Sequence, residues 1–180
     1  SFMEETTKLF NPDKPVLIAD LAAGCSLAES ITGEQVRALK AQHPGAPVVT
    51  YVNSSAEVKA ESDICCTSGN AVAVVESLGA DKVIFLPDGY LANFVARQTN
   101  VEVVSWAGTC MVHEEFTVGQ VEAYRAQYPG LKVLAHPECS PEVQVAADLV
   151  GSTAQMSHFV AQQPAGTQVA LITECSMSDN

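Results

Sequence analysis

The feature of this sequence that most constrains its fold is an internal repeat with a period of 85 residues. When the chain is shifted by 85 positions against itself, 12 of 34 consecutive positions are identical without a gap. The shift places Pro44-Gly45 on Pro129-Gly130, and it places Cys25 on Cys110. Self-similarity at a fixed period indicates a structural unit that occurs more than once along the chain.

The repeat predicts the domain organisation. Residues 1–25 are expected to be the end of a truncated first repeat, residues 26–110 a complete second repeat, and residues 111–180 a truncated third repeat. On this interpretation each complete repeat ends in a cysteine, and the chain is an internal slice of a longer protein with at least three repeats.

Extended and helical patterns alternate within residues 26–110. Apolar runs predict strands at 48–52, 64–67, 82–86 and 101–106, with helices at 35–42, 54–60, 70–78 and 89–98. Residues 111–180 repeat the plan with strands at 132–135, 149–150 and 169–172, and lack the fourth strand. This alternation predicts an α/β fold of pseudo-repeated three-layer αβα units with parallel sheets.

Several local signals refine this prediction. The apolar run at 16–19 is expected to be the last strand of the preceding repeat. Ser26-x-x-Glu29 has the pattern of a capping box that opens a helix, and Ser54-x-x-Glu57 has the same pattern before a short helix. Ser68 and Thr153 are expected to open helices whose free N–H groups favour anions.

The net charge of the chain limits the classes of partner that it can bind. It carries 9 Lys+Arg against 21 Asp+Glu, a net charge of −12, and the basic residues are scattered. A phosphate backbone requires clustered basic side chains, and an anionic membrane surface attracts the same clusters. No apolar run approaches the roughly 18 residues of a membrane span, and the first residues lack a signal-peptide pattern. We therefore expect a cytoplasmic protein without nucleic-acid or membrane partners.

The six cysteines point to buried thiols, metal ligands or catalytic groups rather than to a disulfide framework in a reducing compartment. The absence of a C-x-x-C pair argues against a zinc ribbon and against a thiol-redox protein. Cys65 and Cys66 are expected to be packing residues, at least one of them facing into the sheet. Cys25 and Cys110 follow predicted strands in loops of small residues, and one thiolate from each repeat suits an iron–sulfur cluster with one open iron.

Polar side chains follow the predicted strands, where ligands of parallel sheets bind. Tyr51 and Asn53 occupy the repeat positions of His136 and Glu138. Different polar groups at one repeated position favour a single asymmetric site, and the alternative is a set of ordinary exposed polar residues. Cys139 and Cys175 remain open between packing and function.

The motifs along the whole chain, in order, resemble the quinolinate synthase family. They are Asp20-Leu-Ala-Ala-Gly-Cys25, Tyr51-Val-Asn53, Thr67-Ser68-Gly-Asn, Pro87-Asp88, Trp106-Ala-Gly-Thr-Cys110-Met-Val-His113, His136-Pro-Glu138-Cys and Gly151-Ser152-Thr153. The resemblance implies three pseudo-repeated α/β domains around a [4Fe-4S] cluster, with one cysteine from each. It also implies the condensation of iminoaspartate with dihydroxyacetone phosphate to quinolinate for NAD synthesis, with an L-aspartate oxidase as the partner that supplies iminoaspartate.

The resemblance further implies roles for single residues. Cys25 and Cys110 would be two of three cluster ligands, with the third cysteine beyond Asn180, and the cluster would act as a Lewis acid. Tyr51, His136 and Glu138 would be catalytic, the last two positioning substrate and moving protons. The residues implied to contact substrate are Tyr51, Asn53, Ser68, His136, Glu138, Ser152 and Thr153.

Two expectations follow for the chain as given. The family's first-domain histidine and tyrosine would lie before Ser1, so the fragment itself is expected to be inactive. The alternative to a synthase is a two-lobed module that binds a small dianion or regulates another protein, with packed cysteines and no cluster.

Overall fold

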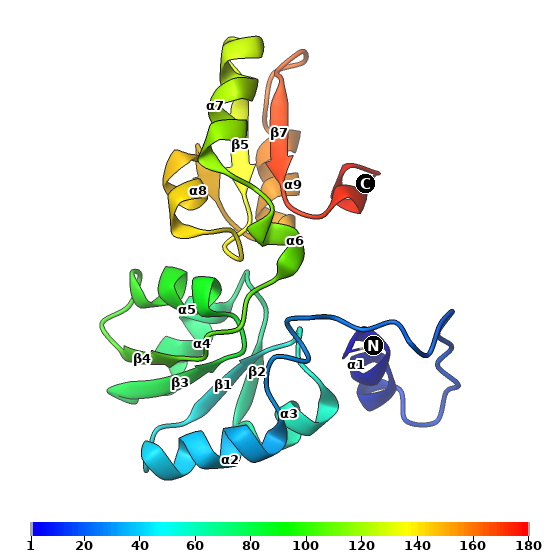
Figure 1. Ribbon diagram of the computed structural model, residues 1–180, viewed down its shortest axis with the longest axis vertical. Helices are drawn as coiled ribbons and strands as arrows, with labels where there is room; N and C mark the ends of the chain where they lie inside the picture. Colours follow the sequence, from blue (N-terminus) through cyan, green and yellow to red (C-terminus); the bar gives the residue numbers. More distant parts are fainter. Residues whose placement is uncertain (1, 180) are drawn as a thin grey trace. The chain divides into compact units, whose positions relative to one another are not determined.

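The computed structural model describes residues 2–179 of the chain (Figure 1). The chain divides into two compact parts, which we call unit 1 (Ser1–Thr109) and unit 2 (Cys110–Asn180).

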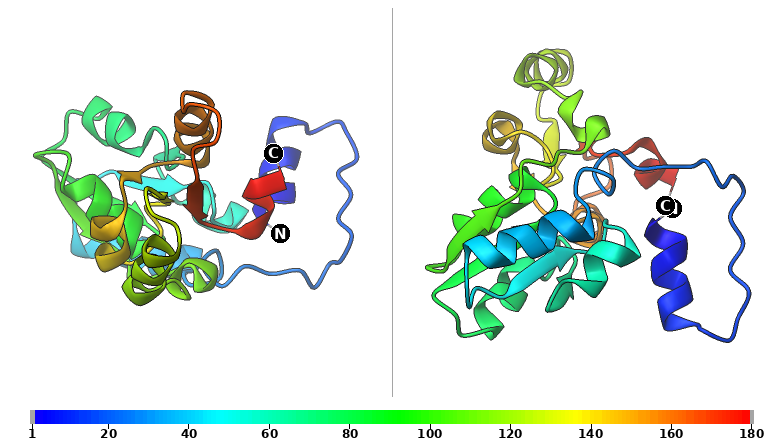
Figure 2. Two further views of the ribbon diagram at one scale, coloured as in Figure 1. Left: turned by 90° about the horizontal axis from the view of Figure 1, so that it is seen from above. Right: turned by 60° about the horizontal axis from the view of Figure 1, so that its bottom comes forward.

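Unit 1 is built around a parallel sheet of four strands in the order β2-β1-β3-β4. Its elements are α1 (Phe2–Phe10), α2 (Gly33–Gln42), β1 (Val48–Tyr51), α3 (Ala56–Ala60), β2 (Ile64–Cys66), α4 (Ala71–Ser77), β3 (Lys82–Leu86), α5 (Gly89–Ala96) and β4 (Glu102–Ser105). Helices α2 and α3 cover one face of the sheet, and α4 and α5 cover the other (Figures 1 and 2). The four strands and the three-layer arrangement predicted for residues 26–110 are therefore confirmed.

Unit 2 has a parallel sheet of three strands in the order β6-β5-β7. Its elements are α6 (Met111–Glu114), α7 (Val118–Gln127), β5 (Lys132–Ala135), α8 (Pro141–Ala146), β6 (Leu149–Val150), α9 (Thr153–Ala161), β7 (Val169–Ile172) and a 3-10 helix (Cys175–Asp179). The three predicted strands are confirmed, whereas α6 and the 3-10 helix were not predicted.

Equivalent caps begin equivalent helices in the two units. Thr32 accepts a hydrogen bond from the N–H of Gln35 at 3.3 Å, and Thr117 accepts one from Gln120 at the same distance. In both cases the glutamine side chain accepts from the N–H of the capping threonine, which completes a capping box. The local sequence alone thus determines where α2 and α7 start.

An aspartate ties the second strand of each sheet to the first. Asp63 accepts from the N–H of Val48 at 2.7 Å, and Asp148 accepts from the N–H of Val133 at 2.8 Å. Arg125 contacts the same oxygen of Asp148 at 2.8 Å. These bonds fix the register at which β1 and β5 begin.

Each unit buries its own apolar cluster between a sheet face and its helices. In unit 1 the cluster includes Ile84 and Leu86, and Val104 and Trp106 of the β4 region pack against it. The indole N–H of Trp106 donates to the carbonyl of Ser30 at 3.0 Å, which holds the end of β4 over the core. The cluster of unit 2 consists of Val121, Val133, Ala135, Cys139, Val143 and Ile172.

Two predicted elements before α2 are wrong. Residues 16–19 form no strand, and Leu17 is 89% exposed. A strand needs a neighbouring backbone to satisfy its N–H and C=O groups, and none of the described strands pairs with this segment. Ser26-x-x-Glu29 forms one turn instead of a helix, because Thr32 is already extended as the cap of α2.

Three predicted helix caps are displaced along the chain. Ser55 caps α3 instead of Ser54, whose buried hydroxyl donates to the carbonyl of Tyr51 at 2.9 Å. Asn70 is the N-cap of α4 in place of Ser68. Ser152 caps α9, so Thr153 is its first helical residue. Ser55 and Ser152 accept hydrogen bonds from the N–H groups of Val58 and Gln155, whereas the side chain of Asn70 makes no cap bond and accepts from the N–H of Thr67.

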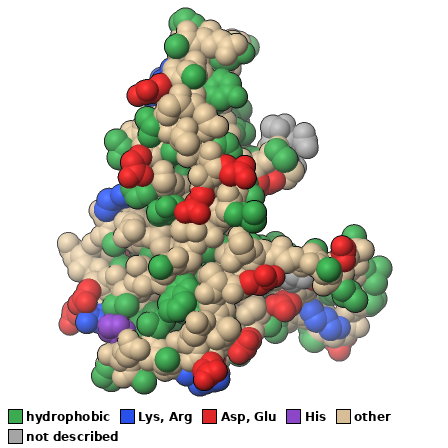
Figure 3. Space-filling model, viewed as in Figure 1, with side chains coloured by type: hydrophobic (Ala, Val, Ile, Leu, Met, Phe, Trp, Pro, Cys, Tyr) green, Lys and Arg blue, Asp and Glu red, His purple; other side chains and the backbone are tan. Residues whose placement is uncertain are grey.

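Acidic side chains do not gather in one patch on the face that Figure 3 shows. On the face drawn in Figure 3, acidic side chains are spread over the surface, with few basic side chains among them. Within residues 2–179, no helix combines the length and apolar character that crossing a membrane requires.

Candidate functional site

The loop after β5 is held rigidly at the carboxyl end of the sheet of unit 2. The N–H of His136 donates to the carbonyl of Ile172 at 3.1 Å, and the N–H of Cys139 donates to the carbonyl of His136 at 3.0 Å. The buried amide of Gln144 donates to the carbonyls of Pro137 and Cys139 at 2.9 and 2.8 Å. Side chains on this loop therefore have a defined orientation.

Three polar side chains are buried together on this loop and on α6. His113, His136 and Glu138 are 6%, 4% and 2% exposed. The two imidazole rings stack with their centres 5.0 Å apart. The Glu138 carboxylate lies beside both rings, with Oε2 3.6 Å from Nδ1 of His113 and Oε1 3.4 Å from Nδ1 of His136. We call these three residues the histidine–glutamate group.

Both imidazoles of this group are neutral at pH 7. Burial lowers the pKa of His136 to about 3, and the nearby His113 lowers it further. Burial likewise lowers the pKa of His113 to about 4, against an opposing effect of Glu174. The N–H of Glu138 donates to Nδ1 of His136 at 3.3 Å, so the ring proton of His136 is on Nε2. His136 thus presents a hydrogen-bond donor at Nε2.

His113 brings the group into contact with the start of unit 2 and with the end of β7. Its Nε2 lies 3.0 Å from Oγ1 of Thr173, whereas its buried Nδ1 has no hydrogen-bond partner. One ligand atom each from Cys110, His113 and Glu138 lies within 4.8 Å of the others. A thiol, an imidazole and a carboxylate at this spacing form a donor set for a metal ion.

The two predicted hydroxyl residues of unit 2 lie at the neighbouring strand end. The N–H of Gly151 donates to the carbonyl of Ala135 at 3.0 Å, so Ser152 follows β6 beside the end of β5. Ser152 is buried, and its backbone N–H donates to Oε1 of Gln155 at 2.8 Å. Thr153 is exposed at the first turn of α9.

In unit 1 the structure brings together two of the predicted residues. The amide of Asn53 donates to the hydroxyl of Tyr51 at 3.0 Å, and the Tyr51 ring is buried. The N–H of Val52 donates to the carbonyl of Cys66 at 2.9 Å, so the half-buried Ser68 follows β2 at the adjacent strand end. Tyr51, Asn53 and Ser68 therefore lie at the carboxyl ends of two neighbouring parallel strands.

Cys25 lies in the loop before α2, next to a small cavity of about 220 Å³ in unit 1. Its N–H donates to Oε1 of Glu29 at 3.3 Å. The same carboxylate oxygen occupies the space that a Cβ on Gly24 would need, so a larger residue there would displace it. The thiol of Cys25 is half-buried.

The six cysteines are all free thiols. Cys66 is buried and Cys65 is exposed, as expected for neighbouring residues of a strand. Cys139 is also buried, and its thiol lies 3.4 Å from the carbonyl of Ile172. This places Cys139 in the packing of unit 2.

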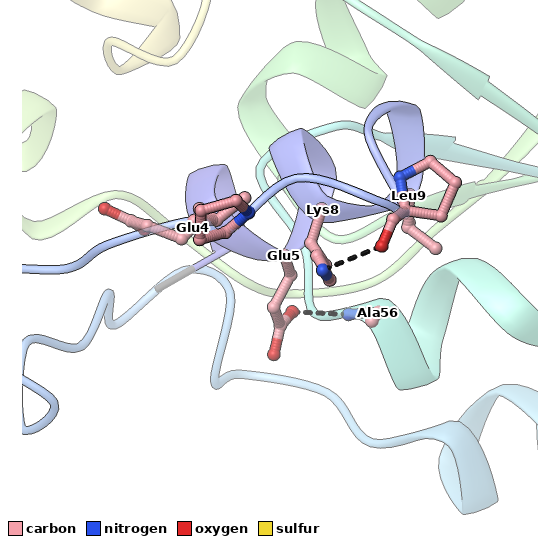
Figure 4. Close-up of a pocket in the computed structure, with 8 residues that line it drawn as sticks. Glu4, Glu5, Lys8, Leu9 and Ala56 are labelled. Carbon is pink, nitrogen blue, oxygen red and sulfur yellow. Dashed lines mark hydrogen bonds between the residues drawn. The ribbon is translucent and has the colours of Figure 1, made fainter.

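One cavity of the described residues lies away from these side chains. It has a volume of about 780 Å³ and lies between α1, the following loop and α3 in unit 1 (Figure 4). Glu5 accepts from the N–H of Ala56 at 2.7 Å, and Lys8 donates to the carbonyl of Pro12 at 2.9 Å. The charged groups of its wall are therefore used in local structure, and none of the predicted site residues lines it.

Three residues near the site were missed by reasoning from the sequence. His113 is part of the motif that contains Cys110, but no role was predicted for it. Its spacing of three residues from Cys110 could have indicated a shared site, because residues at this spacing share one helix face. Thr173 and Gln144 gave no signal, since their contacts depend on tertiary structure.

Comparison with known proteins agrees with the motifs. The profile of the family described as quinolinate synthetase A protein matches residues 1–180. The chain is 64% identical to quinolinate synthase 1 of Mesorhizobium japonicum, 61% to quinolinate synthase of Agrobacterium fabrum and 58% to that of Caulobacter vibrioides. These alignments cover 99% of this chain and 55%, 52% and 50% of the relatives, so the chain spans about half of their length. The chain belongs to the quinolinate synthetase A family.

Proposed function

We propose that this chain supplies a large part of the active site of a quinolinate synthase, which condenses iminoaspartate with dihydroxyacetone phosphate to quinolinate. The observation that carries the proposal is the histidine–glutamate group, buried at the carboxyl end of a parallel sheet. L-aspartate oxidase would be the partner that supplies iminoaspartate. The assignment of residues 1–25, 26–110 and 111–180 to three repeats is part of the same proposal.

The residues of unit 2 would orient the substrate and move its protons. His136 offers an N–H donor at Nε2 to a substrate oxygen, since Nδ1 accepts from the backbone of Glu138. The carboxylate of Glu138 would accept and return protons at carbon and nitrogen as the ring closes. Its loop, held by Gln144, keeps both groups in position.

Hydroxyl groups would hold the anionic ends of the substrates. Ser152 and Thr153 lie at the N-terminus of α9, where free backbone N–H groups and the helix dipole favour a carboxylate or phosphate. Ser68 is proposed to do the same in unit 1. An acidic protein thereby binds dianions without a basic patch.

Tyr51 and Asn53 are proposed as the substrate contacts of unit 1. Their mutual hydrogen bond fixes the tyrosine hydroxyl and the amide relative to each other. Tyr51 is assigned to the reacting carbons and Asn53 to a substrate oxygen.

Cys25 and Cys110 are proposed as ligands of a [4Fe-4S] cluster whose third cysteine is outside this chain. The donor chemistry around Cys110 fits a metal centre, because a buried imidazole nitrogen without a hydrogen bond and a carboxylate lie beside the thiol. When bound, the cluster supplies Lewis-acid chemistry at its open iron.

The test uses the chain extended to the full length of its relatives. After anaerobic reconstitution with iron and sulfide, it should form quinolinate from the two substrates, and Cys110→Ser should remove both the iron and the activity. Activity that survives Cys110→Ser would overturn the ligand assignment. A wild-type protein that binds a small dianion tightly without iron and without activity would instead support a binding module.

A further inference from the structure

We propose that unit 2 contains a site for a single divalent ion of the zinc class, ligated by Sγ of Cys110, Nδ1 of His113 and the carboxylate of Glu138. The site needs no residue of unit 1 and therefore does not depend on Cys25. It shares the Cys110 thiolate with the proposed cluster, so the two metals exclude each other.

The distances between the three ligand atoms fit the coordination of one ion better than they fit hydrogen bonds among these residues. Oε2 of Glu138 lies 3.6 Å from Nδ1 of His113, which is too long for a hydrogen bond. In a tetrahedral site with bonds of about 2.1 Å, neighbouring nitrogen and oxygen ligands are about 3.4 Å apart. The three donor atoms lie within 4.8 Å of one another, so a modest movement of the half-buried Cys110 side chain closes the site.

The His113 ring is already oriented as a metal ligand. Its Nε2 lies 3.0 Å from Oγ1 of Thr173, and its Nδ1 is buried without a hydrogen-bond partner. Metal-bound histidines usually donate their other ring N–H to an oxygen, which fixes the tautomer. Nδ1 lies 3.6 Å from the Glu138 carboxylate, so an ion bound there would place the ring proton on Nε2, which could then donate it to Thr173. A buried nitrogen left unsatisfied is costly, and an ion would satisfy it.

The repeat provides an internal comparison for this site. The shift of 85 residues places Cys110 on Cys25, but His113 on Ala28 and Glu138 on Asn53. Unit 1 therefore keeps the cysteine without the imidazole and the carboxylate. The donor set is specific to unit 2, and its thiolate, imidazole and carboxylate favour Zn²⁺ or Fe²⁺ over Mg²⁺ or Ca²⁺. Three protein ligands leave a fourth position open.

The test titrates the metal-free chain of 180 residues with Co²⁺ under reducing conditions. One equivalent should give the thiolate-to-cobalt charge-transfer band and the intense visible bands of tetrahedral cobalt, and Zn²⁺ should displace it. Cys110→Ala, His113→Ala and Glu138→Gln should each weaken binding at least about tenfold, and Thr173→Val about 10–100-fold. The matched control Cys25→Ser should bind like the wild type.

Binding that survives Cys110→Ala or His113→Ala would overturn the proposal, and so would loss of binding in Cys25→Ser. X-ray absorption of the wild-type zinc complex avoids the question of whether variants fold. It should show one sulfur at about 2.3 Å and nitrogen or oxygen ligands at about 2.0–2.2 Å. A spectrum with no sulfur, or with two, would contradict the site. Because a cluster requires Cys25 and this ion does not, failure here leaves the proposed function intact.

Discussion

Unit 1 and unit 2 share a scaffold and differ at the ends of their strands. A capping box begins α2 and α7, an aspartate accepts from the first strand residue of each sheet, and a basic residue of the preceding helix contacts that aspartate. That basic residue is Lys40 in unit 1 and Arg125 in unit 2. The capping boxes and the aspartate contacts at the strand starts are therefore present in both units.

The strand ends, in contrast, carry different chemistry. Tyr51 and Asn53 stand where unit 2 has His136 and Glu138. The first pair is joined by one hydrogen bond, whereas the second is buried with a stacked histidine. Tyr51 is the last residue of β1 and His136 directly follows β5, so both pairs lie at carboxyl ends of strands, where side chains can diverge while the scaffold stays the same.

The substitutions with the largest expected effect test this difference between the strand ends of the two units. In the full-length protein, Glu138→Gln should lower kcat by at least about 100-fold, because the group that moves protons is lost. Asn53→Ala should act mainly on KM, by about tenfold, because one hydrogen bond to substrate is lost. Steady-state assays of both variants measure the contrast. Equal effects on kcat would show that the two strand ends do not have separate roles.

A stability comparison tests the difference between the four-stranded sheet of unit 1 and the three-stranded sheet of unit 2. Leu86→Ala should cost about 2–5 kcal/mol, since a fully buried side chain covered by Val104 and Trp106 leaves a cavity. Ile172 pairs with Ala135 in β5 as Leu86 pairs with Thr50 in β1, but Ile172 borders a groove of about 280 Å³. Ile172→Ala should therefore cost only about 2 kcal/mol, at the low end of that range. Urea unfolding of the two variants measures the difference, and a larger loss for Ile172→Ala would contradict it.

Asp148 gives unit 2 an acid-sensitive contact. Burial raises the pKa of this carboxyl, but the hydrogen bond from Val133 and the pairing with Arg125 and Lys132 outweigh it and hold the pKa below its ordinary value of 3.8. The stabilisation is therefore present above pH 3.8 and is lost as the pH falls through the lower, folded-state pKa.

Asp148→Asn should cost about 1.5 kcal/mol at pH 7, the value of a hydrogen bond to a charged group, and nothing at the acid limit. Unfolding free energies measured from pH 7 down to pH 2 check this expectation. The matched variant Arg125→Gln should produce part of the same loss. A cost for Asp148→Asn that stays constant with pH would contradict the proposed pairing.

The smallest effect should be the same in both units. Thr32→Ala and Thr117→Ala should each cost about 1 kcal/mol, because each removes the hydroxyl of a capping box. Thr→Ser at either position should restore most of the loss. Thermal unfolding followed by circular dichroism measures both, and a difference well above the error would show that one cap depends on its surroundings.

The sequence predicted what depends on local patterns. Apolar runs placed all the strands from Val48 onward, because each lies between clear turn signals. The prediction for residues 16–19 failed, since a strand depends on a neighbour and not only on its own composition. The site showed the same limit: His136 and Glu138 were predicted, but the contact of His113 with Thr173 joins residues distant in sequence.

That contact also affects the order in which the protein matures. Thr173 and His113 are 60 residues apart, so during synthesis His113 is made well before its oxygen partner. The ring can be oriented only after β7 has joined the sheet, because closing so long a loop is entropically costly until the sheet has formed. The site can therefore assemble only after the ribosome has synthesised the chain to the end of β7.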